Sequence, residues 1–169
     1  VLMPLFKVIF KKEGEKNDDV ILKINNVDAA YSSSVKVLHK VSIEVPRGRT
    51  VAVVGESGSG KSTTARVITG LLPPMSGDVQ FNGEVLPKDL ASRSKDQLRK
   101  IQMIYQMADT AMNPRHTIRE IIGRPLEFYL GLRGNKRDDR LLELLHLIEL
   151  DESFVDRLPS ELSGGQKQR

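Results

Sequence analysis

Residues 55–62 constrain the fold of this chain more than any other feature of its sequence. They read GESGSGKS, which fits two glycines separated by four residues, with Lys and then Ser or Thr after the second glycine. A β-branched run, residues 50–54, precedes them, and a helical pattern, residues 62–72, follows and stops at a pair of prolines. This order predicts an α/β fold with a P-loop, in which residues 50–54 form a buried parallel strand.

The chemistry of such a loop is phosphate binding. Glycines let the backbone curve so that successive N–H groups point at phosphate oxygens, and the helix N-terminus adds its positive dipole. Lys61 is expected to reach the β- and γ-phosphates of ATP, and the hydroxyl of Ser62 to bind Mg²⁺. The alternative is a Gly/Ser turn that happens to hold a lysine. The residues expected to contact ATP here are Gly55, Glu56, Ser57, Gly58, Ser59, Gly60, Lys61, Ser62 and Thr63.

Other segments show clear periodicity. Residues 20–28 and 35–45 alternate apolar and polar side chains and predict half-buried strands, and residues 101–105 predict a short buried strand. Two leucine-rich helices are expected at residues 117–129 and 138–150. In the second helix, Asp138 is expected to be the N-cap and Asp139 an acidic residue of the first turn.

Composition excludes several classes of function. The chain is 39% hydrophobic and 28% charged, as in a globular domain. Its net charge is +4, and its basic residues are scattered along the whole sequence. With five Phe, three Tyr and no Trp, a base-stacking surface for nucleic acid is not expected. The lack of cysteine excludes disulfides, thiolate catalysis and cysteine zinc sites, and fits a reducing compartment.

A second motif lies near the end of the sequence. A serine followed by two glycines and the run QKQR predicts an N-cap and an open helix N-terminus, which is again a place for an anion. The alternative is a Gly-Gly linker into a basic helix. The residues of this motif, called the signature below, are Leu162, Ser163, Gly164, Gly165 and Gln166.

Together, the loop and the signature resemble the ATP-binding cassette (ABC) family in order and spacing. The resemblance implies a head-to-tail dimer in which the signature closes over the γ-phosphate held by the opposite subunit. By position, Tyr31 resembles the aromatic residue that stacks on adenine, for which Phe is expected to substitute. Gln106 resembles the glutamine that touches Mg²⁺ and the attacking water. The alternatives are a tyrosine beside a strand and a strand-end glutamine.

Residues 55–66, 101–106 and 113–118 look like the ATPase subunits of peptide and nickel importers. That subfamily usually has Asp-Pro after the glutamine, whereas Met107 and Ala108 stand here. The resemblance implies an ABC ATPase core with an antiparallel β-subdomain and a helical subdomain. We expect an N-terminal extension or linker at 1–19, with 11–19 as the linker, a nucleotide-binding core at 20–106 and a helical subdomain at 107–169. Residues 1–10 are apolar, and either the tail of a preceding domain or a stub fits them.

The function implied by the resemblance is ATP hydrolysis that drives solute uptake, most simply of peptides. The expected partners are a second ATPase subunit and transmembrane permease subunits, not nucleic acid, at the cytoplasmic face of the membrane. The catalytic aspartate, the general base and the switch histidine are expected downstream of the signature, so this chain is expected to be a truncated piece that does not hydrolyse ATP. Asp151, Glu152 and the three histidines precede the signature and are not expected to replace them.

Two other functions remain open at this point. One is a soluble ABC-type ATPase that clamps a macromolecule, and the other is a regulatory pseudo-subunit that binds ATP. Residues 113–118 (NPRHTI) and the few aromatic residues favour transport over the clamp.

Overall fold

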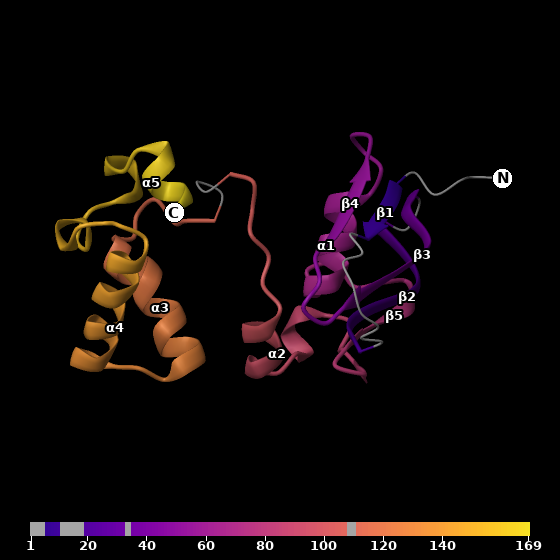
Figure 1. Ribbon diagram of the computed structural model, residues 1–169, viewed down its shortest axis with the longest axis horizontal. Helices are drawn as coiled ribbons and strands as arrows, with labels where there is room; N and C mark the ends of the chain where they lie inside the picture. The colour runs from indigo at the N-terminus through magenta and orange to yellow at the C-terminus, as the bar shows by residue number, and fades with distance from the viewer. Residues whose placement is uncertain (1–5, 11–18, 33–34, 108–110) are drawn as a thin grey trace. The chain divides into compact units, whose positions relative to one another are not determined.

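The computed structural model describes residues 6–10, 19–32, 35–107 and 111–169, so most of the linker expected at 11–19 lies outside the described residues. The chain divides into two compact units, Val1–Met103 and Ile104–Arg169. The first unit contains β1 (Phe6–Phe10), β2 (Val20–Ser32), β3 (Val35–Pro46), β4 (Val51–Gly55), α1 (Lys61–Thr69), β5 (Ser76–Phe81), β6 (Glu84–Val85), a 3-10 turn at Leu90–Ser92 and α2 (Lys95–Lys100) (Figure 1). The second contains α3 (Ile118–Leu130), α4 (Gly134–Leu147), 3-10 turns at Glu152–Phe154 and Pro159–Glu161, and α5 (Gly164–Gln168).

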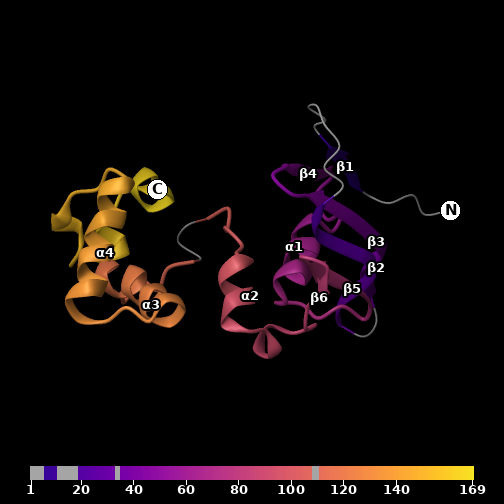
Figure 2. The same cartoon turned by 60° about the horizontal axis from the view of Figure 1, so that its bottom comes forward.

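The strands predicted at residues 20–28 and 35–45 form an antiparallel pair, β2 and β3. A second antiparallel strand, β5, lies on the other edge of β2, and the sheet order is β3-β2-β5-β6 (Figure 2). The pairing register shifts between Ile24 and Val27, where Asn26 has a φ of 46°. This bulge brings Ile24 and Val27 to the same buried face although they are three residues apart.

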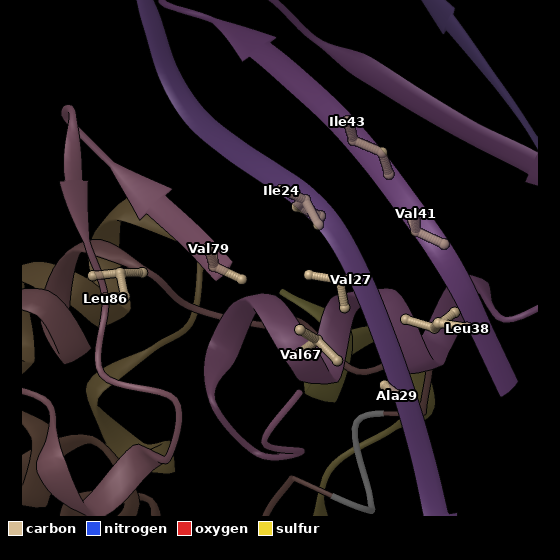
Figure 3. Close-up of a cluster of buried hydrophobic side chains, with 9 residues drawn as sticks. All are labelled: Ile24, Val27, Ala29, Leu38, Val41, Ile43, Val67, Val79 and Leu86. Atoms are coloured by element: carbon tan, nitrogen blue, oxygen red, sulfur yellow. The ribbon is translucent and has the colours of Figure 1, made fainter. Parts of the chain in front are cut away.

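The core of the first unit lies between this sheet and α1. Val67 of α1 lies beside Val27 of β2 in Figure 3, and both side chains are buried. The helix that begins with Lys61 is therefore held against the sheet by apolar packing. The buried side chains of this cluster are Ile24, Val27, Ala29, Leu38, Val41, Ile43, Val67, Val79 and Leu86.

Gly77 allows a close approach between β5 and β2. Its φ is 77°, and a Cβ atom built on it would lie 2.3 Å from the carbonyl oxygen of Asn25 and 2.6 Å from that of Asn26. Both contacts are to backbone atoms, which cannot swing away as a side chain can. Only glycine fits this position without a shift of one strand.

The strand β4 forms as predicted but is not a buried parallel strand. Among the described residues its only partner is β1, which is antiparallel and places Lys7 opposite Val54. Val54 is 42% exposed. A parallel strand is buried by layers on both faces of its sheet, and the part of the chain that the structure describes places one antiparallel strand beside β4. An apolar run alone therefore does not establish burial.

The prediction of a strand at residues 101–105 is wrong. The helix α2 ends at Ile101, which is its C-cap, and the residues that follow have no regular structure. Ile104 is 96% exposed and Tyr105 is also exposed. A strand forms its backbone hydrogen bonds with a neighbouring strand, and none of the strands that the structure describes pairs with this segment.

Both helices predicted in the second half of the chain form, one of them from an earlier residue than expected. The predicted helix 117–129 is confirmed as α3, and Thr117 and Glu120 form a reciprocal capping box at its start. The predicted start of the next helix is wrong, because α4 begins at Gly134 and Asp138 lies inside it. The carboxylate of Asp138 instead accepts from Arg119 of α3 and from Arg137.

The second core is separate from the first in its residues. It consists of Ile118, Leu126, Leu141, Leu145, Leu150, Val155 and Leu162.

Within the described residues, none of the helices combines the length and the apolarity that crossing a bilayer requires.

Candidate functional site

The predicted P-loop connects β4 to α1 through two glycines with left-handed backbone. Gly58 has a φ of 79° and Gly60 a φ of 98°. A Cβ on Gly60 would lie 2.7 Å from Cδ2 of Leu38, whereas one on Gly58 would meet no atom within 4 Å. Gly60 is therefore favoured both by its backbone conformation and by its close approach to the buried side chain of Leu38, and Gly58 only by its conformation.

Lys61 folds its side chain back over the loop. Its Nζ donates to the carbonyl oxygen of Gly55 at 2.8 Å, to that of Glu56 at 2.6 Å and to Oγ of Ser59 at 3.3 Å. The amide of Ser59 donates in turn to the carbonyl of Glu56 at 3.2 Å. The loop is thus wrapped around one ammonium group, which places a positive charge at the N-terminus of α1.

The two ends of α1 are fixed by different contacts. At the start, the amide and the hydroxyl of Thr64 both donate to the carbonyl of Gly60, at 2.8 and 3.0 Å. At the end, Arg93 donates from Nη1 to the carbonyl of Ile68 at 2.6 Å and from Nε to that of Pro87 at 3.1 Å. Burial lowers the pKa of Arg93, but an arginine stays protonated. A cation at the C-terminal end of α1 also interacts favourably with the helix dipole.

Tyr31, predicted as the adenine-stacking residue, lies against the first two turns of α1. Its hydroxyl is 3.3 Å from Oγ1 of Thr63 and accepts from Nη1 of Arg66 at 3.2 Å. The guanidinium carbon of Arg66 lies over the ring, 5.5 Å from its centroid. No motif in the sequence marks Arg66, although its spacing of three residues from Thr63 places both on one face of a helix. The structure brings Tyr31 and the P-loop helix together.

The strand that carries Tyr31 is anchored by Asp28. Its carboxylate accepts from the amide of Lys40 at 2.9 Å, from Nζ of Lys36 at 3.2 Å and from Oγ of Ser76 at 3.0 Å. These contacts, first the bond from the Lys40 amide, lower the pKa of Asp28 to about 2. Lys40 has a φ of 48°, so the carboxylate also stabilises an uncommon backbone conformation.

The other predicted residues belong to the second unit. Gln106 is exposed in a bend and is not next to a strand. Ser163 caps α5 as predicted: its Oγ accepts from the amide of Gln166 at 3.2 Å, and the Gln166 side chain accepts from the Ser163 amide at 2.9 Å. Leu162 is buried in the second core, and a Cβ on Gly164 or Gly165 would meet nothing within 4 Å. Packing within the chain therefore does not require either glycine.

The chemistry available at the loop is anion binding. Lys61 and the N-terminus of α1 present positive charge, and Ser62 is exposed on the first turn. Within the described residues, no group of three or more His, Cys, Asp or Glu is arranged to hold a metal ion. A single hydroxyl fits Mg²⁺, because Mg²⁺ bound with a nucleotide takes most of its ligands from phosphate and water. Asp151 is the N-cap of a 3-10 turn and Glu152 is its first residue, so neither lies on a strand.

Comparison with known proteins gives one consistent result. The family model described as "ABC transporter" matches residues 38–169. The nickel import ATP-binding protein NikE of Brucella suis is 44% identical over 153 residues, which cover 89% of this chain and 58% of that protein. The protein of the same name from Escherichia coli K12 is 43% identical over 133 residues, covering 79% and 50%. The chain thus spans about half the length of these curated relatives.

Solved structures agree with the sequence relatives. A dimeric ATP-binding cassette in a post-hydrolysis state, bound to ADP and phosphate, superposes with a TM-score of 0.66 at 31% identity and covers 87% of this chain and 65% of its own. The ATP-binding subunit of an ABC transporter superposes with a TM-score of 0.66 at 27% identity, covering 88% and 58%.

Proposed function

Because the chain belongs to the ABC transporter family and has its P-loop fold with an antiparallel β-subdomain and helices, we propose that it is the nucleotide-binding part of an importer ATPase subunit. It binds ATP with Mg²⁺, and the protein that contains it hydrolyses ATP to drive solute uptake. The observation that carries this proposal is the P-loop itself, in which Gly60 is favoured by its surroundings and Lys61 sits at the N-terminus of α1.

When phosphate binds at this loop, Lys61 exchanges hydrogen-bond acceptors within the loop for phosphate oxygens. Its Nζ now donates to two carbonyl oxygens and one hydroxyl of the loop. A phosphate group is negatively charged, with the charge shared among its oxygens, and a charge-assisted hydrogen bond to it is about twice as strong as one between neutral groups. The exchange is therefore favourable for the ammonium group. Ser62, exposed on the same turn, supplies a hydroxyl for Mg²⁺, and Thr63 lies between the loop and Tyr31.

The second unit supplies two groups that act on the γ-phosphate. Gln106 is proposed to orient water and Mg²⁺. The signature is proposed to contact ATP held by another subunit in a head-to-tail dimer, for which its two exposed glycines leave room for close approach to a phosphate. The domain division proposed from sequence, 20–106 and 107–169, assigns Gln106 to the nucleotide-binding core and the signature to the helical subdomain.

The transported solute and the partners are proposed from the relatives. Two of them are nickel import ATP-binding proteins, and the sequence also resembles the peptide importers. We propose nickel, peptides or similar solutes as cargo, transmembrane permease subunits as partners, and a peripheral position at the cytoplasmic face of the membrane.

The test of nucleotide binding is calorimetric titration of the chain with Mg²⁺ and ATP. Replacing Lys61 by Ala removes a charge-assisted contact worth about 1.5–3 kcal/mol, so ATP affinity should fall about ten- to 150-fold. Lys88→Ala is the matched control, because it removes the same charge from an exposed residue outside the loop. Equal affinity in the wild type and in Lys61→Ala would contradict the proposal.

A further inference from the structure

The hydroxyl of Tyr31 has two partners that a stacking platform does not need. Stacking uses only the flat face of the ring, and Phe serves for it as well as Tyr does. Here, however, the hydroxyl contacts Thr63 at 3.3 Å and Arg66 at 3.2 Å, and both partners come from one face of α1. The ring is therefore attached at its polar end to the helix that carries Lys61.

Arg66 makes the second of these attachments in two ways at once. Its Nη1 donates to the hydroxyl, and its guanidinium lies over the ring with its carbon 5.5 Å from the centroid. A cation at this distance is attracted by the electrons of the ring face. A guanidinium combines both contacts because it is planar and has several donors, whereas an ammonium is a point charge.

The ring is not buried by these contacts, since Tyr31 is 54% exposed. With its hydroxyl attached and a guanidinium over one face, the ring is held in one orientation, and its other face is the one on which a base can stack. Without the attachment, a tyrosine ring at the end of a strand samples several rotamers, and ordering it costs free energy when a ligand binds.

We propose that Arg66 is a positioning residue that holds the Tyr31 ring in the orientation in which it stacks on the base of the nucleotide, with the base on the face opposite the guanidinium. This inference rests on the proposed function. Arg66 acts on the base through Tyr31 and not on the phosphates, and the distance between base site and phosphate loop is set by α1, which carries both Lys61 and Arg66.

The test compares two ligands in the full chain, Mg²⁺–ATP and Mg²⁺–tripolyphosphate, which has phosphates and no base. An exposed cation–π contact of about 0.5–1 kcal/mol corresponds to about two- to fivefold in affinity. Arg66→Ala should weaken ATP binding by about this factor and leave tripolyphosphate binding unchanged. Arg66→Lys keeps the charge and should restore part of the loss. Retained tripolyphosphate binding also shows that the variant folds.

A double-mutant cycle identifies the route of the effect. In a chain that carries Tyr31→Ala, Arg66→Ala should have no further effect on ATP, because the ring through which it acts is gone. Tyr31→Phe, which keeps the ring and loses the hydroxyl, should weaken ATP by about two- to tenfold, in contrast to the sequence-based expectation that Phe substitutes freely.

Three results would overturn the inference. The first is an equal loss of ATP and tripolyphosphate affinity in Arg66→Ala, which would show a direct effect of charge on the phosphates. The second is no loss of ATP affinity, and the third is an undiminished loss in the Tyr31→Ala background. A wild-type chain that binds neither ligand would contradict the proposed function itself, and the inference with it.

Discussion

In the unit Val1–Met103 most of the buried side chains come from strands, some of them distant in the sequence, whereas in Ile104–Arg169 they come from two consecutive helices and the turns that follow them. Ile24 of β2 packs with Val79 of β5, but Leu126 and Leu141 lie on consecutive helices. The capping contacts of the helical unit are also local, as in Thr117 with Glu120.

The two units differ in how their backbone hydrogen bonds are satisfied. The helical unit needs no partner to pair its backbone, because a helix forms its hydrogen bonds within itself. The first unit contains β4, whose apolar residue Val54 is exposed and which has one neighbouring strand among the described residues. The side chains of an apolar strand are buried when layers pack on both faces of its sheet, and the described residues leave Val54 uncovered. The comparison predicts different responses to mutation in the two units.

The largest effects are expected from large-to-small substitutions in the two cores. Leu145→Ala in the helical unit and Ile24→Ala in the sheet unit each remove a fully buried side chain, at a cost of about 2–5 kcal/mol in the free energy of unfolding. Hydrogen exchange should show Leu145→Ala acting on the amides of α3 and α4, and Ile24→Ala on those of β2 and β3. If either variant deprotects both sets equally, the two cores unfold as one and the comparison fails.

Gly77→Ala should have the next largest effect, confined to the sheet unit. Its Cβ would meet two backbone oxygens and its φ is positive, so the expected loss is about 3 kcal/mol. Gly83→Ala is the matched control, because Gly83 has a similar φ of 80° and open space around it. It should lose only the cost of backbone strain, about 1 kcal/mol. Chemical denaturation measures both, and equal losses would show that the close approach of β5 to β2 is not the cause.

A smaller difference is expected between two capping boxes. Thr117→Ala should lower the free energy of unfolding by about 1 kcal/mol, because α3 carries the buried Ile118 and Leu126. Ser94→Ala removes an equivalent cap from α2, which buries none of its residues. It should fray α2 with little change in global stability. A thermal shift as large for Ser94→Ala as for Thr117→Ala would contradict this distinction.

The smallest effect is expected from pH at Asp28. Since its pKa is lowered to about 2 from a value near 3.8, the ionised carboxylate stabilises the sheet unit above about pH 4, and this contribution disappears as the pH falls toward 2. Asp28→Asn should lack this pH dependence. Denaturation midpoints of both proteins at pH 5, 4 and 3 test it, and a constant difference between them would contradict the assignment.

Sequence predicted best what depends on local chemistry. The helix expected at residues 117–129, the cap at Ser163 and the helix after the P-loop were predicted from adjacent residues alone, and the structure confirms them. The resemblance also gave the family and the fold, which the comparisons confirm. The helix after the P-loop ends at Thr69, before the prolines expected to stop it, because Gly70 adopts the left-handed conformation of a C-cap.

Prediction from the sequence failed where contacts between distant residues determine the local structure. Residues 101–105 are apolar enough for a buried strand, yet strand formation depends on a partner that no property of the segment supplies. The start of α4 was missed because Asp138 reads as a cap, whereas Arg119 on another helix binds its carboxylate. The roles of Tyr31, Gln106 and the signature stay predictions, and the contact of Arg66 with Tyr31 required the geometry.

The open space around Gly164 and Gly165 has a consequence for any library of variants of this chain. A selection for folded, soluble protein would reject most substitutions at Gly77 or Gly60, because an added carbon meets neighbouring atoms there. The same selection would accept side chains at Gly164 and Gly165, where an added carbon meets nothing. A stability screen is therefore blind to the two glycines of the signature, and enrichment after a second round, in which variants are captured by a nucleotide-loaded cassette, would be the first signal to come from those two positions.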